Sequence, residues 1–304
     1  MEVPYFCSIF AKRIIIMINI SDIIERNKKR PEPKEITEIR ENIINTFSKL
    51  EFIEDVHKYF LPQKDGTKIE LPSVSATAHK FEPFVDWDEK CAAKALKLGI
   101  PTEKLKREWL EHNRLATNTG TGVHLYGEMY MHFIQGHPEE ICSVIKPQYE
   151  EGYLFPHSPK ETAVMHYWED LFKIDDIFPV MPETRVYMGV NDKFKVKQPY
   201  AGTFDILLAM KHQGKWKLLL HDYKTNADIY SNYAKKWNNT LLEPFTDFVN
   251  EPKSVYTIQL NLYQLCLEQL GYEIIDRRLI WLKDNETYEK ISLPNITDRL
   301  LKVI

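Results

Sequence analysis

Helical periodicity is the main pattern in the first half of the chain. Apolar residues recur every three or four positions through most of the first fifty residues, between runs of charge, which predicts a helical extension or arm with one solvated face. A helix that binds a partner is the alternative for this segment. Ser73, after Pro72, is placed to cap a helix, and Ser254 and Gly271 are placed to begin and end the last one. Longer helices are predicted at 86–98, 102–115, 122–134, 160–172 and 255–270.

Strand patterns are concentrated in the second half. One early hairpin is predicted, in which residues 59–61 and 68–71 pair around a turn at Lys64-Asp65-Gly66. Later strands are predicted at 183–188, 202–210 and 215–223, with turns at Asn191-Asp192 and His212-Gln213-Gly214, and a final hairpin at 277–283 and 287–293. This order of elements predicts an α/β (α+β) fold, in which helices flank a central mixed β-sheet and the N-terminal part is helical.

Length and composition indicate an ordinary folded protein. With 304 residues, 43% of them hydrophobic and 28% charged, the chain can bury a sizeable core and is neither disordered nor collagen-like. We divide it into a helical extension, residues 1–50, and one domain, residues 51–304, with a helical insertion at about 73–175 and a core at about 176–304. Its 40 basic and 44 acidic side chains give a net charge of −4, which excludes a polybasic binder.

Cysteine spacing and hydropathy restrict the location. The cysteines at positions 7, 91, 142 and 266 form no zinc-type cluster, so a reducing compartment is the simplest expectation. The apolar stretch from Tyr5 to Ile20 is interrupted by Lys12 and Arg13 and is too short to span a bilayer. Glu2 and the lack of a small-residue cleavage site disfavour a signal peptide. We therefore expect no membrane partner.

Two acids and a lysine carry the clearest chemical signal. If the turn is centred near Gln213 and Gly214, Asp205 and Asp222 lie nearly opposite each other on paired strands, with Cβ atoms about 4.5–5.5 Å apart. Carboxylates this close repel unless they share a proton or bind a cation. Lys224 lies two residues after Asp222, hence on the same face of the strand, where an ammonium can hold a phosphate oxygen or an attacking water.

An exposed cross-strand pair with Lys224 as its counterion is the alternative interpretation of these residues. The apolar run from Leu218 to Leu220 favours burial on both faces of the strand, where unpaired charge is expensive. Other catalytic patterns are missing from the sequence, since it has no P-loop lysine motif, no G-x-S-x-G elbow, no G-x-G-x-x-G fingerprint and no H-E-x-x-H.

The hairpin residues resemble the core of the PD-(D/E)XK nuclease superfamily, with Asp in the second acid position and without the proline of the motif name. Upstream, Ala116 to His124 with Glu128 one turn later is similar to the histidine motif of the RecB-like branch. Downstream, Gln259 to Tyr263 resembles the Q-x-x-x-Y helix of that branch. The similarity spans about 59–282, and Pro72 to Ser75 resembles phage-type and mitochondrial-genome-maintenance exonucleases.

The resemblance implies roles for these residues. Asp205, Asp222 and Lys224 would be catalytic, and Asp205, Asp222, the Tyr223 carbonyl and His124 would hold Mg²⁺ or Mn²⁺. A hydrogen-bonded or ion-paired histidine is the alternative for His124.

Accessory roles are also implied. Gln259 and Tyr263 would contact a phosphate or position the lysine, or else satisfy hydrogen bonds in the core. Independently of the resemblance, the positive charges of Lys235, Lys236 and the basic residues between Lys94 and Arg114 could contact phosphate, or these side chains could equally lie on solvated helix faces. Glu183 would be an additional acid, but an ordinary carboxylate at a strand edge is the interpretation we favour, and Glu128 is expected to be a supporting partner of the site rather than a ligand.

The function implied by the resemblance is that of a divalent-metal-dependent DNA exonuclease in DNA processing, recombination or replication. Its partners would be single- or double-stranded DNA ends and a recombination or replication protein. No iron-sulfur cluster is expected, because only Cys266 follows the catalytic lysine. The expected location is the cytoplasm, that of a host cell if a phage encodes the protein, ahead of the mitochondrial matrix. A noncatalytic DNA-binding or recombination-accessory protein on the same scaffold is the alternative.

Overall fold

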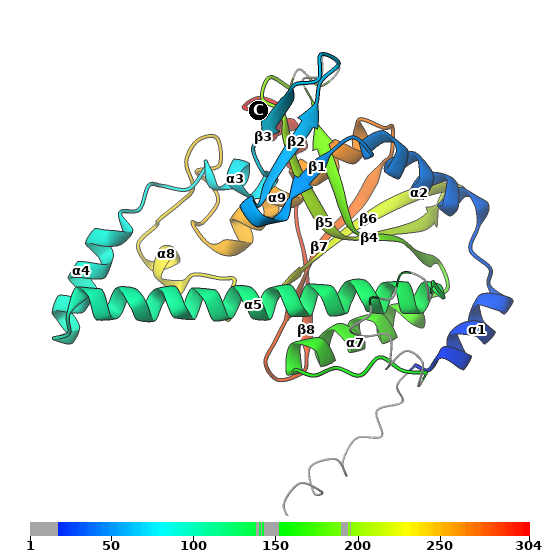
Figure 1. Ribbon diagram of the computed structural model, residues 1–304, viewed down its shortest axis with the longest axis horizontal. Helices are drawn as coiled ribbons and strands as arrows, with labels where there is room; N and C mark the ends of the chain where they lie inside the picture. The colour runs from blue at the N-terminus through cyan, green and yellow to red at the C-terminus, as the bar shows by residue number, and fades with distance from the viewer. Residues whose placement is uncertain (1–17, 138–139, 141, 143–151, 190–193, 195) are drawn as a thin grey trace, which may run out of the picture.

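A five-stranded mixed sheet forms the centre of the molecule in the computed structural model, which describes residues 18–137, 140, 142, 152–189, 194 and 196–304 (Figure 1). Its strands follow the order β4 (Ile177–Met188), β5 (Tyr200–His212), β6 (Lys215–Lys224), β7 (Ile274–Leu282) and β8 (Tyr288–Ser292). Neighbouring strands are antiparallel except β6 and β7, which are parallel. A parallel pair needs a crossover connection, which the chain between Lys224 and Ile274 supplies with a long helix. The predicted mixed sheet is confirmed.

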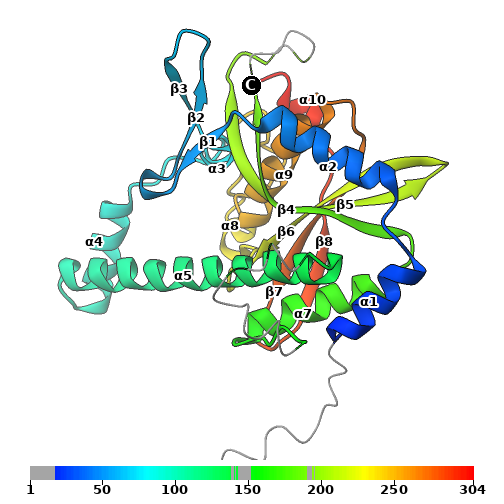
Figure 2. The ribbon, with the colours of Figure 1, turned by 45° about the vertical axis from the view of Figure 1, so that its right-hand side comes forward.

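Helices cover both faces of this sheet, as Figures 1 and 2 show. One layer contains α2 (Lys34–Phe47), α3 (Val74–His79), α9 (Pro252–Glu268) and α10 (Thr297–Leu300), which share one hydrophobic core with the sheet. The other layer contains α1 (Ile20–Lys29), α5 (Thr102–Gln135) and α7 (Pro159–Phe172), which share a second core. The apolar face of α2 is buried against β4, so residues 34–47 form part of the layer, while their charged face is solvated.

A small second sheet lies beside the first. It consists of β1 (Glu51–Ile53), β2 (Lys58–Pro62) and β3 (Lys68–Leu71), with a short 3₁₀ turn, η1 (Glu54–Val56), between β1 and β2. The predicted hairpin is therefore confirmed, and β1 is an addition to it. Ser73 caps α3 as predicted, because its side chain accepts a hydrogen bond from the amide of Ala76. The remaining helices in the described part of the chain are α4 (Trp87–Leu98) and α8 (Asn232–Lys236).

The two helices predicted at 102–115 and 122–134 are wrong as separate elements, because α5 runs through both without a break. Glycine in a helix costs about 1 kcal/mol relative to alanine, a penalty that tertiary packing can offset. The predicted break at 116–121 is largely exposed, and the close packing comes beyond it, at Gly127, where a Cβ would lie 2.5 Å from Cε2 of Tyr223. Within the described residues, no helix is both long and apolar enough to span a bilayer, α5 included.

The start of α9 also differs from the prediction. The helix begins at Pro252 after an N-cap at Glu251, and Ser254 is already inside its first turn. Proline is favoured at the first helical position, where its missing N–H costs nothing, so it displaces the start by one turn. The final hairpin of β7 and β8 has the predicted pairing. The turn predicted at Asn191-Asp192 lies outside the described residues.

Candidate metal centre

The hairpin of β5 and β6 brings two acids side by side at one end of the sheet. Gln213 and Gly214 both have positive φ, 51° and 76°, as a two-residue type I′ turn requires. Pairing runs from the residues beside that turn to Ile206 and His221. The next position along the same register holds Asp205 on β5 and Asp222 on β6.

The neighbouring strand β4 adds a third acid. Pro182 pairs with Ile206 and Thr184 with Phe204, so Glu183 lies between them, across from Asp205. Glu183 has a φ of 35°, a left-handed conformation that is strained for a side-chain-bearing residue. The sequence favoured an ordinary strand-edge carboxylate at this position. The structure instead places Glu183 in a row of three acids that crosses β4, β5 and β6.

The helix α5 supplies a histidine to this row. His124 Nδ1 lies 3.4 Å from Oε1 of Glu183 and 3.4 Å from Oδ2 of Asp205. One ligand atom from each of these three residues lies within 4.8 Å of the other two, which is close enough to share a metal ion. We call His124, Glu183 and Asp205 the three-residue cluster. Asp222 is not part of it, and neither is Glu128.

Asp222 and Lys224 form a buried ion pair next to the cluster. The side chains of Asp222 and Lys224 are 3% and 12% exposed, and the ammonium also lies 4.2 Å from the centre of the Tyr256 ring. Between them in sequence, the amide of Tyr223 donates a hydrogen bond of 2.7 Å to Oδ2 of Asp205. The Tyr223 amide therefore orients Asp205, while a ligand role for the Tyr223 carbonyl stays a prediction.

Burial and mutual charge shift the titration of all these groups. Burial together with the charge of Asp205 raises the pKa of Glu183 to about 7 and that of Asp222 to about 6. For Asp205, burial opposes ionisation, but His124, Lys224 and the Tyr223 amide outweigh it and lower its pKa. Burial alone would lower the pKa of His124 and of Lys224, but the adjacent carboxylates raise both.

The residues present suit a divalent cation. Oε1 of Glu183 is buried and has no hydrogen-bond partner, although it lies at ion-pair distance from His124. Three carboxylates within one small volume repel one another, and a doubly charged ion relieves that repulsion. Carboxylate oxygens suit hard ions such as Mg²⁺, Ca²⁺ and Mn²⁺, while an imidazole is also accepted by zinc and iron. The donor set could therefore hold a divalent ion, and it does not select one.

Two members of the cluster, His124 and Glu183, line a hollow between α5, the small sheet and β4, while Asp205 is not among its lining residues. Tyr263 lines it, and a Cβ at Gly202 would lie 2.8 Å from the Tyr263 ring. Gln259 lies near the Tyr263 hydroxyl, where it partly offsets the rise that burial causes in the Tyr263 pKa. The lining residues are Phe52, Glu54, His57, Tyr59, Ser73, Val74, Ser75, Gly120, Thr121, His124, Leu125, Glu128, Glu183, Arg185, Gly202, Thr203 and Tyr263.

Tyr59 and Arg185 are among the lining residues that were not predicted as site residues from the sequence. Tyr59 from β2 shares a hydrogen bond of 3.1 Å with Thr203 of β5, and Arg185 of β4 lies with its guanidinium 5.4 Å from the centre of the Phe52 ring. No local motif marks them, because the small sheet reaches the large one through long-range contacts, in which Tyr59 and Leu71 share a hydrophobic cluster with Ala201.

The two predicted lysines of α8 lie apart from the hollow. Lys235 Nζ is 3.4 Å from the Glu251 carboxylate and 4.8 Å from the centre of the Tyr230 ring. Lys236 Nζ is 5.8 Å from the centre of the Trp237 ring. Neither lysine lines the hollow. Both are exposed, so contact with phosphate stays a prediction for them.

The packing of α5 on Tyr223 leads to a first testable prediction. The Tyr223 ring cannot swing away from a new methyl group at Gly127, because its hydroxyl is held by Trp168 Nε1 at 2.7 Å. We expect Gly127→Ala to lower the free energy of unfolding by about 1–3 kcal/mol, despite the helix propensity of alanine. Thermal melting of the purified variant measures this.

Gly122 is the matched control on the same helix. A Cβ there would meet no atom within 4 Å, so Gly122→Ala should leave stability unchanged or raise it by up to about 1 kcal/mol. Equal melting temperatures for the two alanine variants would contradict the close contact between α5 and β6.

A scan against models of protein families finds no match, and no curated protein is significantly similar to the chain.

Proposed function

We propose that this protein is a divalent-metal-dependent nuclease that hydrolyses phosphodiester bonds in DNA, acting as an exonuclease in DNA processing, recombination or replication. The observation that carries the proposal is the adjacency of the three-residue cluster to the buried pair of Asp222 and Lys224. The pattern of Asp205, Asp222 and Lys224 on one hairpin, which resembles PD-(D/E)XK nucleases, supports the same chemistry.

Each residue of the site has a distinct task in this proposal. His124, Glu183 and Asp205 would hold Mg²⁺ or Mn²⁺, and Asp222 is the neighbouring carboxylate, paired with Lys224. A bound ion of this type supplies charge stabilisation and makes water more acidic. Lys224 stays protonated because Asp222 and Asp205 raise its pKa, so its ammonium can attract a phosphate oxygen. Asp222 in turn fixes the direction of that ammonium through their ion pair.

The surroundings provide polar surface for a strand of DNA despite the net charge of −4. Residues 106–119 of α5 are exposed all around the helix, on the N-terminal side of His124. In this exposed part, Lys106 is paired with Asp88 and Arg114 with Glu111, at the surface where such pairs are weak and easily exchanged for phosphate. Local charge matters more than the total for steering a polyanion.

A single assay tests the proposed function. We expect purified protein to degrade end-labelled single- or double-stranded DNA when Mg²⁺ or Mn²⁺ is present and to stop when EDTA is added. The position of the label in the products gives the polarity of digestion. Tight DNA binding without any metal-stimulated cleavage would contradict the nuclease and favour the recombination-accessory protein.

A further inference from the structure

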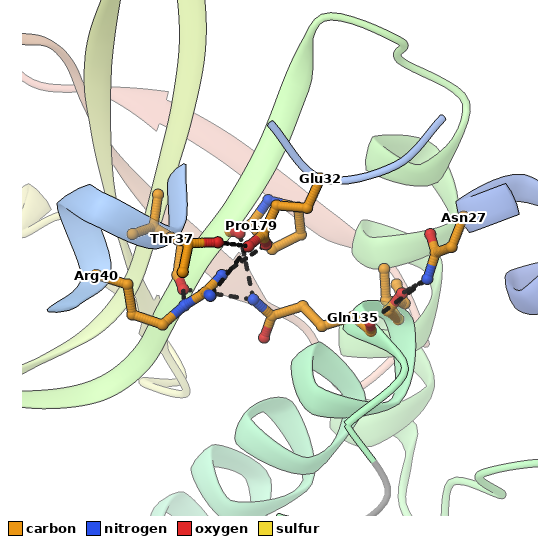
Figure 3. A network of polar contacts seen from close by, with 8 residues as sticks. Asn27, Glu32, Thr37, Arg40, Gln135 and Pro179 are labelled. Atoms are coloured by element: carbon orange, nitrogen blue, oxygen red, sulfur yellow. Dashed lines mark hydrogen bonds and ion pairs between the residues drawn. The ribbon is translucent and has the colours of Figure 1, made fainter. Parts of the chain in front are cut away.

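A polar network joins the N-terminal helices and the end of α5 to an irregular point in β4 (Figure 3). Pro179 pairs with Leu208, but the next paired residues are Met181 and Leu207, so Val180 is an extra residue in the strand. Such a β-bulge leaves backbone groups outside the ladder and changes the direction of the side chains that follow. Bulges of this kind are common next to active sites.

Two side chains from different helices hold the bulge. The carbonyl oxygen of Val180 accepts a hydrogen bond of 2.7 Å from Nε of Arg40 and one of 3.3 Å from Nε2 of Gln135. Gln135 Nε2 also lies 3.2 Å from the carbonyl oxygen of Pro179. Val180 is completely buried, and a buried carbonyl outside the ladder needs such partners.

The donor on α2 is itself held in place. Both terminal nitrogens of Arg40 contact the carboxylate of Glu32, at 3.0 and 2.6 Å, and the Thr37 hydroxyl donates to the same carboxylate at 2.9 Å. A guanidinium whose two terminal nitrogens are both bound has a fixed orientation. The Nε–H group of Arg40 therefore points toward the bulge.

The bulge determines which residue of β4 faces Asp205. From Ile177, which pairs with Met210, a regular strand would place Pro182 across from Asp205. The extra residue shifts the register by one, and Glu183 takes that place. Because side chains alternate along a strand, a shift of one residue changes which side chain reaches the site.

Gln135 also connects two of the three elements that carry residues of the cluster, α5 and β4. On α5, Gln135 lies eleven residues, or about 16 Å of helix, beyond His124. On β4, it binds the carbonyl of Val180, three residues or about 10 Å along the strand from Glu183. We propose that Arg40 and Gln135 are positioning residues, which hold the β4 bulge so that Glu183 meets His124 and Asp205. This inference rests on the metal centre of the proposed function.

The test compares metal binding with stability. Calorimetric titration with Mn²⁺ would be run on the wild type, on Gln135→Met, on Arg40→Met and on the double variant. Methionine keeps most of the side-chain volume but donates no hydrogen bond. We expect the double variant to bind Mn²⁺ at least tenfold more weakly and to need correspondingly more metal for half-maximal cleavage. Arg40→Lys retains one donor and should recover part of the affinity, and it replaces Arg40→Met if that variant does not fold.

Arg30→Met is the matched control. The Arg30 side chain is 17% exposed, like that of Arg40. It donates to the carbonyls of Ile174, just before β4, and of Ile177, the first residue of β4, both of which precede the bulge. Arg30→Met should lower the melting temperature while leaving Mn²⁺ affinity within twofold of the wild type. An unchanged affinity in the double variant, or an equal loss in Arg30→Met, would overturn the inference.

Failure of the proposed function is distinguishable from failure of this inference. Wild-type protein that binds Mn²⁺ and loses that affinity in the double variant, but cleaves no DNA, would contradict the nuclease and uphold the positioning roles. Wild-type protein that binds no Mn²⁺ would overturn both.

Discussion

Asp205→Asn is expected to abolish metal-stimulated cleavage, with a loss on the order of 10³-fold or more. Asp205 lies at the centre of the site, because its carboxylate is 3.4 Å from His124, accepts the Tyr223 amide and faces Glu183 across β4 and β5. Asparagine keeps the shape and can still accept the amide hydrogen bond, so the fold should survive. It removes the charge that would hold a cation, so Mn²⁺ binding should be lost together with cleavage. Both are measured on the same preparation, by calorimetry and by cleavage of end-labelled DNA.

Asp276→Asn is the control for this substitution. Asp276, on β7, lies 3.3 Å from Nε2 of His221 and 2.7 Å from Nε of Arg278, so it is also a carboxylate paired with a histidine on the large sheet. It lies outside the three-residue cluster. Asp276→Asn should therefore reduce stability but retain metal-stimulated cleavage. Cleavage by Asp205→Asn at the rate of Asp276→Asn would refute the assignment of the site.

The hairpin that carries Asp205 and Asp222 could be predicted from the sequence because everything that defines it is local. Two strands joined by a two-residue turn have one register, which the turn residues Gln213 and Gly214 determine. Alternation along β6 then places Lys224 with Asp222, and the ion pair between them agrees with this expectation.

Glu183 could not be placed in the same way. Its register with Asp205 depends on a bulge at Val180 that distant side chains from α2 and α5 hold, and no local pattern in β4 shows it. The sequence showed only a carboxylate near the start of a strand. Its proposed role as a ligand rests on tertiary geometry.

The length of α5 was underestimated for a related reason. Glycine and threonine between Ala116 and Gly122 have low helix propensity, which favoured a break. Propensity is a weak determinant of where a helix ends, and α5 continues through this largely exposed stretch into the part where Gly127 packs closely on Tyr223. The uninterrupted helix extends on both sides of His124, so its ring is held on a rigid element rather than next to a loop.

Lys224→Met is expected to separate metal binding from cleavage. The ammonium of Lys224 is ion-paired with the carboxylate of Asp222. Because Lys224→Met removes this ammonium, the carboxylate of Asp222 becomes free to bind a cation, and Mn²⁺ affinity should be unchanged or higher. Cleavage should nevertheless fall by about 10²–10³-fold, because the charge that stabilises the phosphate in the transition state is lost. Calorimetry with Mn²⁺ and single-turnover cleavage at saturating metal measure the two effects independently.

Lys217→Met provides the comparison on the same strand. The side chains of Lys217 and Lys224 are 14% and 12% exposed, and Lys217 is paired with Glu273 away from the site. Both substitutions remove one ion-paired lysine from β6, but only Lys224→Met should slow cleavage. If folded Lys224→Met cleaves DNA at the wild-type rate, this lysine has no catalytic role and the proposed mechanism is wrong. If cleavage and Mn²⁺ affinity fall together, Lys224 instead supports the shape of the metal centre, because its loss would then act as Asp205→Asn does.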